Sequence, residues 1–226
     1  GAGRILEGGR GFFAALCPDA APDALLAAPD APWQLTRTSL KPWPCCRHTH
    51  PAIDAALALH APGDAEPPLA VRIETFQAAL DVCDQPSPQT PYAAKFSLQH
   101  CVNAALASGR VGFESFDDAH RHRLAGVSNA TTVAASPEFE AAYPARWGAA
   151  VSVTRPSGGM TRVVRRDCKG DPHAPLTQAE IIDKARSLLR HGGEGEASAQ
   201  LTDTILGLPE APAMPPFPLR APGPTP

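Results

Sequence analysis

The sequence has few aromatic residues and no long apolar run, and both absences exclude classes of protein. Phe, Trp and Tyr make up 6% of the 226 residues, and the formal net charge is −3. Such a chain has neither a broad cationic field nor the aromatic platforms used for nucleic acids, so we expect no nucleic-acid partner. No stretch approaches the roughly 20 apolar residues that span a bilayer, and no basic segment leads into an apolar one as in a secretory signal. We therefore expect no membrane partner either.

Cysteine is also scarce, with six residues in the chain. None of them forms a CxxC motif or a Cys/His pair with zinc-site spacing, so we expect no metal and no disulfide scaffold. We interpret the six cysteines as reduced thiols in a cytoplasmic protein. The sequence also lacks GxGxxG, Walker A, GxSxG and HExxH motifs, which leaves a dehydrogenase, an NTPase, a serine hydrolase and a zinc protease without support.

Proline, in contrast, is abundant, with 26 residues, and eight of these lie between Pro209 and Pro226. A segment so rich in proline has too little apolar surface to bury, so we expect 209–226 to be a disordered tail. The remaining prolines stiffen loops.

Hydrophobic periodicity predicts an α+β fold in which helices cover an antiparallel sheet. Thr177 and Glu180 form a capping box at the start of one helix, and Gly109 ends another. The expected strands are 33–40, 69–76, 131–135, 149–154 and 160–165, the last two forming a hairpin. One expected helix begins after Thr49. The others cover 92–108, 117–124, 177–191 and 197–206.

The segment 41–50, KPWPCCRHTH, carries the most unusual chemistry. Lys41 stands at the predicted end of a strand, and two prolines stiffen the chain behind it. Arg47 and His48 then precede a helix whose N-terminal amides favour anions. Together these groups predict a site for a carboxylate or a phosphate, although a solvated basic loop explains the residues equally well. A metal site at His48 and His50 lacks a third ligand.

Four segments, taken in order, resemble the carboxy-terminal half of the MmgE/PrpD family. The resemblance extends from Ile5 to about Leu208 and is most specific in the second and third segments. The segments are ILEGGRGFFAAL at 5–16, LKPWPCCRHTHPAIDAALAL at 40–59, YAAKFSLQHCVNAALASGRV at 92–111 and KGDPHAPLTQAEIIDKARSLL at 169–189.

The resemblance implies an all-helical domain, a smaller α+β lid domain and an active site between them. Family members are typically homodimers that need no metal or other cofactor and act on small polycarboxylates. They include 2-methylcitrate dehydratase of propionate metabolism, cis-aconitate decarboxylase and an iminodisuccinate epimerase. By resemblance, Lys41 and His48 are the candidate catalytic residues, and Cys46 and Arg47 the candidate substrate-binding residues.

The same resemblance predicts how the chain is organised. Residues 1–32 would end the helical domain, 33–166 would form the lid, and 167–208 would be helices that pack back on the helical domain. Because complete family members are roughly twice as long, we expect a hydro-lyase with half a site, completed in a homodimer or by an amino-terminal helical chain. The alternatives are a family epimerase or decarboxylase, and a remnant without activity. The faces at 5–16 and 177–206 are then expected to expose apolar side chains.

Overall fold

The computed structural model describes residues 3–17, 19–25, 33–63, 67–195 and 197–216 of the chain. It divides into two compact units, Gly1–Thr38 and Ser39–Pro226. The four predicted domain ranges stay a prediction. The first unit contains the short helix α1 (Phe12–Leu16) and the 3-10 helices η1 (Pro22–Leu25) and η2 (Gln34–Arg37).

The strand predicted over 33–40 is wrong, because η2 occupies that place. The carbonyl of Trp33 accepts the Thr36 amide at 2.9 Å and the Thr36 hydroxyl at 2.7 Å. These short-range bonds close a turn inside the segment, whereas a strand would need a partner strand beside it. Threonine therefore stabilises a local turn here, where its strand propensity predicted a sheet.

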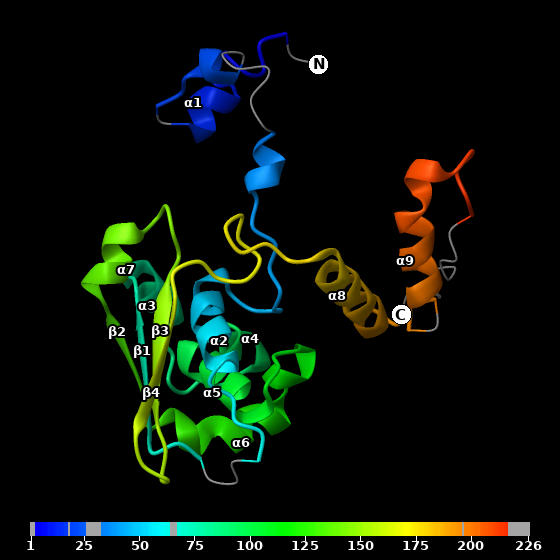
Figure 1. Ribbon diagram of the computed structural model, residues 1–226. Coiled ribbons are helices and arrows are strands. Elements are labelled where there is room, and N and C mark those ends of the chain that lie inside the picture. Colours follow the sequence, from blue (N-terminus) through cyan, green and yellow to red (C-terminus); the bar gives the residue numbers. More distant parts are fainter. Residues whose placement is uncertain (1–2, 18, 26–32, 64–66, 196, 217–226) are drawn as a thin grey trace. The chain divides into compact units, whose positions relative to one another are not determined.

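The second unit is built on one four-stranded sheet with strand order β2-β1-β3-β4 (Figure 1). The strands are β1 (Ala70–Thr75), β2 (Thr131–Ala135), β3 (Ala149–Thr154) and β4 (Met160–Arg165). The α+β class and the β3–β4 hairpin are confirmed. The sheet is mixed rather than antiparallel, because β1 and β2 are parallel. Several helices connect these two strands, and such a crossover returns the chain in the same direction.

The helices of the second unit follow most of the predicted positions. The helix predicted over 92–108 is divided, because the chain turns at 95–97 and Ser97 caps the second part by accepting the His100 amide at 3.0 Å. Gly109 ends it in the left-handed conformation, as predicted. The helices are η3 (Arg47–Thr49), α2 (His50–Leu57), α3 (Gln77–Cys83), α4 (Pro91–Ala94), α5 (Leu98–Ser108), η4 (Phe113–Phe116), α6 (Asp118–Ser128), α7 (Pro137–Ala142), α8 (Gln178–His191), α9 (Ser198–Leu206) and η5 (Leu208–Glu210).

The main core lies between one face of the sheet and the helices α2 and α5. Ile53 of α2, Ile73 of β1, Val102 of α5 and Val151 of β3 are completely buried there. A smaller cluster lies on the opposite face, where α3 and α7 cover one end of the sheet around Phe76. Together the two clusters hold the loop before α2 between well-packed elements, which makes it a rigid support for a site.

The carboxy-terminal helices α8 and α9 pack on each other, and their apolar side chains remain partly exposed as predicted. The predicted capping box of Thr177 and Glu180 is confirmed. Most of the predicted disordered tail, 217–226, lies outside the described residues. None of the helices within the described ranges is long and apolar enough to cross a membrane.

Candidate functional site

The loop that carries Lys41 is held at both ends by backbone hydrogen bonds. The Leu40 amide donates to the Gly170 carbonyl at 2.9 Å, and the Cys46 amide donates to the Lys95 carbonyl at 2.9 Å. Gly170 has a φ of +94°, and a Cβ atom there would lie 2.0 Å from the Leu40 carbonyl oxygen. Only glycine allows this approach, so the turn at Gly170 fixes the path of the chain into the loop.

Lys41 lines a cavity of about 280 Å³ between this loop and α8. Its Nζ donates to the Cys45 carbonyl at 3.1 Å, while the side chain stays largely exposed. Lys184 of α8 lines the same cavity, with Trp43 and Phe113 among its apolar walls. Among the residues that the structure describes, no carboxylate lies within ion-pair distance of Lys41. Two cations therefore face one small apolar-walled cavity, an arrangement that suits a small anion.

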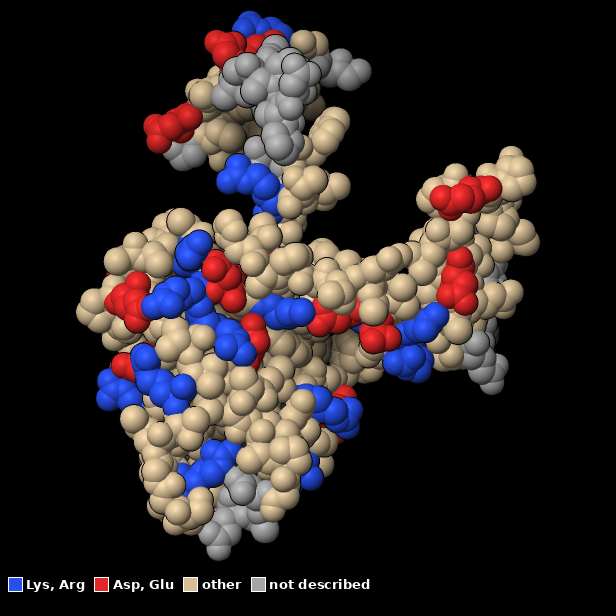
Figure 2. All heavy atoms as spheres, viewed as in Figure 1, with Lys and Arg blue, Asp and Glu red and all other residues tan. Residues whose placement is uncertain are grey.

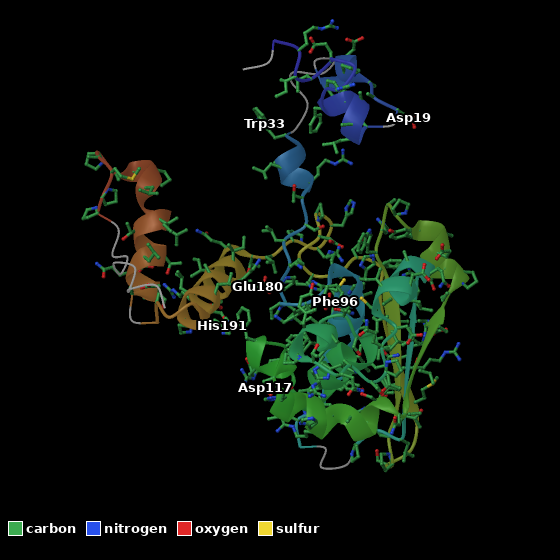
Figure 3. All side chains as sticks on the ribbon, turned by 180° about the vertical axis from the view of Figure 1, so that it is seen from behind. Asp19, Trp33, Phe96, Asp117, Glu180 and His191 are labelled. Atoms are coloured by element: carbon green, nitrogen blue, oxygen red, sulfur yellow. The ribbon has the colours of Figure 1, made fainter. Side chains whose placement is uncertain are left out.

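A second cavity of about 510 Å³ adjoins the first along Trp43 and Lys184. Its lining includes three acidic residues, Asp54, Glu180 and Asp183, and the first two of these are in ion pairs. Glu180 binds Lys169 at 2.8 Å, and Asp54 binds Arg165 at 3.2 Å. Figure 3 labels Glu180 at the start of α8, and His191 at its end.

The Glu180 carboxylate belongs to the framework of the site. The Lys169 ammonium, followed by the amide and the hydroxyl of Thr177, lowers the pKa of Glu180 to about 2. It therefore stays ionised at neutral pH and cannot serve as a proton donor there. Its charge is used in the capping box and in the contact with Lys169, which leaves Lys41 and Lys184 as the cations available to a ligand.

Arg47 lies in a separate group of residues. Its guanidinium forms an ion pair with Asp171, which also accepts the Ser39 hydroxyl at 2.8 Å. The guanidinium carbon lies 4.8 Å from the centre of the Trp147 ring, a cation–π contact. Asp171 is only 8% exposed. The charge of Arg47 is thus already paired, and this pair joins η3 to the turn that contains Gly170.

His48 and Cys46 belong to the same group as Arg47. The Sγ atom of Cys46 lies 3.4 Å from Nδ1 of His48. The His48 ring packs on Trp147 at 4.7 Å and on Phe76 at 5.9 Å between centroids, which fixes its orientation. The residues that line the two cavities beside Lys41 do not include His48 or Cys46.

His50 is a core residue. It is completely buried, its ring stands edge-on to Trp43 at 5.1 Å, and its two nitrogens have no hydrogen-bond partner within the described part of the chain. Within the described part of the chain, no cluster of three His, Cys, Asp or Glu side chains could hold a metal ion.

Of the four predicted site residues, the structure therefore brings together Cys46, Arg47 and His48, and it places Lys41 at a different opening with Lys184. Their assigned roles stay predictions. Sequence reasoning missed Lys184 and Asp171. The spacing of Glu180, Lys184 and Ser187, which places them on one helix face, was the available signal for Lys184. Basic and acidic side chains lie next to one another on the face seen in Figure 2.

A comparison with known protein families identifies the family of this chain. The model of the MmgE/PrpD C-terminal domain matches residues 43–207, which include the loop from Trp43 onwards, the whole sheet and both carboxy-terminal helices. The chain belongs to the MmgE/PrpD family. No curated protein matches it. Lys41 lies two residues before the matched region, and Lys184 lies within it.

Proposed function

We propose that this chain supplies the lid side of an MmgE/PrpD-type active site, in a hydro-lyase that dehydrates 2-methylcitrate or a related polycarboxylate. The observation that carries the proposal is the cavity of about 280 Å³ lined by both Lys41 and Lys184. Two ammonium groups on separate elements match a ligand with two or more carboxylates. Family membership supports the reaction class.

The two lysines would act by binding and by electrostatic stabilisation. When a proton leaves the carbon next to a carboxylate, negative charge spreads onto the carboxylate oxygens. A fixed ammonium group stabilises that charge in the transition state without having to reorganise. Lys41 is suited to this because Pro42 and Pro44 stiffen the loop and Gly170 fixes its start.

The proton-transfer groups are a separate part of the proposal. His48 is predicted as catalytic, and its contact with Cys46 and Trp147 gives it a fixed ring plane. We propose that an amino-terminal helical domain, from a longer form of this chain or from another chain, faces the Lys41 cavity and supplies the acid and base there. The assembly would then be a homodimer or a pair of complementing chains.

The test is an activity assay on the chain co-expressed with a helical domain of the same family, with 2-methylcitrate as substrate. We expect turnover well above that of the isolated chain, and a loss of roughly 100-fold on Lys41→Met, because one fixed cation at the developing charge contributes about that factor. Lys184→Met should mainly raise KM. Arg166→Met, at an exposed ion pair with Glu138, is the matched control and should change neither constant.

The outcomes separate the alternatives. Absence of turnover both with and without the helical domain would support a remnant without activity. Release of CO2, or inversion at a carbon without loss of water, would assign a decarboxylase or an epimerase instead. Unchanged turnover in Lys41→Met would refute the role of Lys41.

A further inference from the structure

A third cavity, of about 290 Å³, lies in the second unit at the end of the sheet next to α6 (Figure 1). It is formed by α5, α6, the residues that follow α2 and the end of β3. It shares no lining residue with the two cavities beside Lys41. Its volume is close to the lower limit of small-molecule sites, which is roughly 300 Å³. The cavity is therefore a separate place for a small ligand, and the proposed function does not use it.

The walls of this cavity are mainly apolar. Leu106 of α5, Leu124 and Val127 of α6 and Val153 of β3 all line it. Leu124 and Val153 are 5% and 1% exposed, so the core packed around them fixes their positions. Such walls gain free energy by contact with an aliphatic group, and they do not replace the water around an ion.

The amide of Asn103 is buried at this cavity, and only one of its two polar atoms is satisfied. Asn103 lines the cavity and is 1% exposed. Its Oδ1 atom accepts the Thr131 hydroxyl at 3.1 Å, whereas its Nδ2 atom has no hydrogen-bond partner in the described part of the chain. Buried amides are almost always hydrogen-bonded, because a donor removed from water loses free energy unless it finds an acceptor. Asn103 therefore favours a ligand that brings an acceptor atom.

His60 supplies an acceptor to the same cavity. Its Nδ1 atom lies 2.7 Å from the Leu106 carbonyl oxygen. A carbonyl oxygen can only accept, so Nδ1 carries the proton and Nε2 is the acceptor of the neutral ring. Gly109 packs against this ring, because a Cβ atom there would lie 2.5 Å from Cδ2 of His60. The ring is thus fixed, and its acceptor favours a ligand that also carries a donor.

We propose that this cavity binds an uncharged aliphatic alcohol. The hydroxyl accepts a hydrogen bond from Nδ2 of Asn103 and donates one to Nε2 of His60, and the aliphatic part contacts the apolar walls. A carboxylate has no proton to donate to Nε2. Arg155 also lines the cavity, and its guanidinium donates to the Leu59 carbonyl at 2.8 Å, so a carboxylate of the same length is included in the test. The proposal does not depend on the proposed function, because the two concern separate cavities.

The experiment titrates the full chain with n-hexanol and follows the backbone amides by two-dimensional NMR. We expect saturable shifts at Leu106, Val127 and Val153, and hexanoate should bind at least about tenfold more weakly because its charge must lose water. Ala107→Trp, at an exposed position that lines the cavity, should abolish these shifts, because the indole ring fills the space. Ala125→Trp, at an exposed position of α6 that does not line the cavity, is the matched control and should leave the affinity unchanged.

Asn103→Leu tests the hydrogen bond from the amide. Leucine has a similar size but no donor, and the Thr131 hydroxyl still has the Val127 carbonyl at 3.2 Å as an acceptor. We expect n-hexanol to bind roughly five- to tenfold more weakly, the factor that one neutral hydrogen bond contributes. Since Ala107 is on the surface, its variant tests the site even where Asn103→Leu does not fold.

Two kinds of result would overturn the proposal. No saturable shift with n-hexanol, or shifts that persist in Ala107→Trp, would show that the cavity is not a binding site. Hexanoate that binds as tightly as n-hexanol, or an unchanged affinity in Asn103→Leu, would show that the ligand is not an alcohol held by this amide.

Discussion

At the scale of single residues, Asp171 connects several parts of the fold through its side-chain carboxylate. It pairs with Arg47, accepts the Ser39 hydroxyl and receives a weak bond from the Cys168 thiol at 3.6 Å. The ion pair is largely buried, with side-chain exposures of 18% for Arg47 and 10% for Asp171. A charge left alone in such a place must stay desolvated without a counter-ion.

We therefore expect Asp171→Ala to lower the free energy of unfolding by about 3 kcal/mol, because it leaves the Arg47 charge unpaired. Urea denaturation measures this change. The control is Asp203→Ala, which removes the partner of Arg186 at 3.1 Å in an exposed pair and should cost less than about 1 kcal/mol. The double variant Arg47→Met, Asp171→Leu should be more stable than Asp171→Ala alone. If Asp171→Ala lowers the free energy of unfolding no more than Asp203→Ala does, the Arg47–Asp171 pair does not stabilise the loop before α2.

At the scale of elements, the start of α8 depends on a reciprocal cap. The Thr177 hydroxyl accepts the Glu180 amide at 3.3 Å, and Glu180 accepts the Thr177 amide at 2.8 Å. Lys169 extends this cap to the turn before the helix. Since Lys184 is on the same helix, the cap also positions one of the two cations of the candidate site.

Thr177→Ala should destabilise α8 by about 1 kcal/mol, because the first-turn amides lose their acceptor. It should also raise the pKa of Glu180 from about 2 towards an ordinary carboxyl value, which carboxyl carbon NMR measures. Because the folded-state pKa is the lower one, the contribution of Glu180 is complete above about pH 4.5 and is lost as the pH falls towards 2. Thr204→Ala, which removes a hydroxyl bonded to the Gln200 carbonyl within α9, should leave α8 unchanged.

At the scale of the whole molecule, both compact units expose large apolar side chains. In the first unit these are Ile5, Leu6, Phe12 and Leu16, which are 65%, 50%, 49% and 68% exposed. In α8 and α9 they are Ile181, Leu188, Ile205 and Leu206, at 43% to 49%. Large apolar side chains that are exposed to this extent are typical of a surface that another element covers.

We expect the chain alone to associate with rising concentration, because association removes these side chains from water. Light scattering should show a mass above that of one chain. The double variant Ile205→Lys, Leu206→Lys should shift the population towards the monomer. Substitution of Arg72 by Met, on the exposed face of the sheet, is the control and should leave the mass unchanged. A monodisperse monomer that binds no apolar dye would contradict the prediction.

Local patterns predicted most of the elements. The alternation in β1, the hairpin of β3 and β4 and the cap of α8 were all visible in short windows of sequence, because side chains within a few residues determine each of them. The prediction of a strand at 33–40 was wrong for the same reason, because Thr36 gives the Trp33 carbonyl a hydrogen-bond partner within a local turn. The break between α4 and α5 was missed because Ser97 acts both as a cap and as a donor to the carbonyl of Gln85, which lies in the loop before α4.

The sequence by itself determined the family and the α+β class, and it singled out 41–50 as the candidate loop, because these depend on residue types in a fixed local order. The tertiary structure alone decided which groups face one another. Arg47 meets Asp171 across 124 positions, and Lys41 shares its cavity with Lys184. Such pairs form where packed elements cross, and local periodicity carries no information about those crossings.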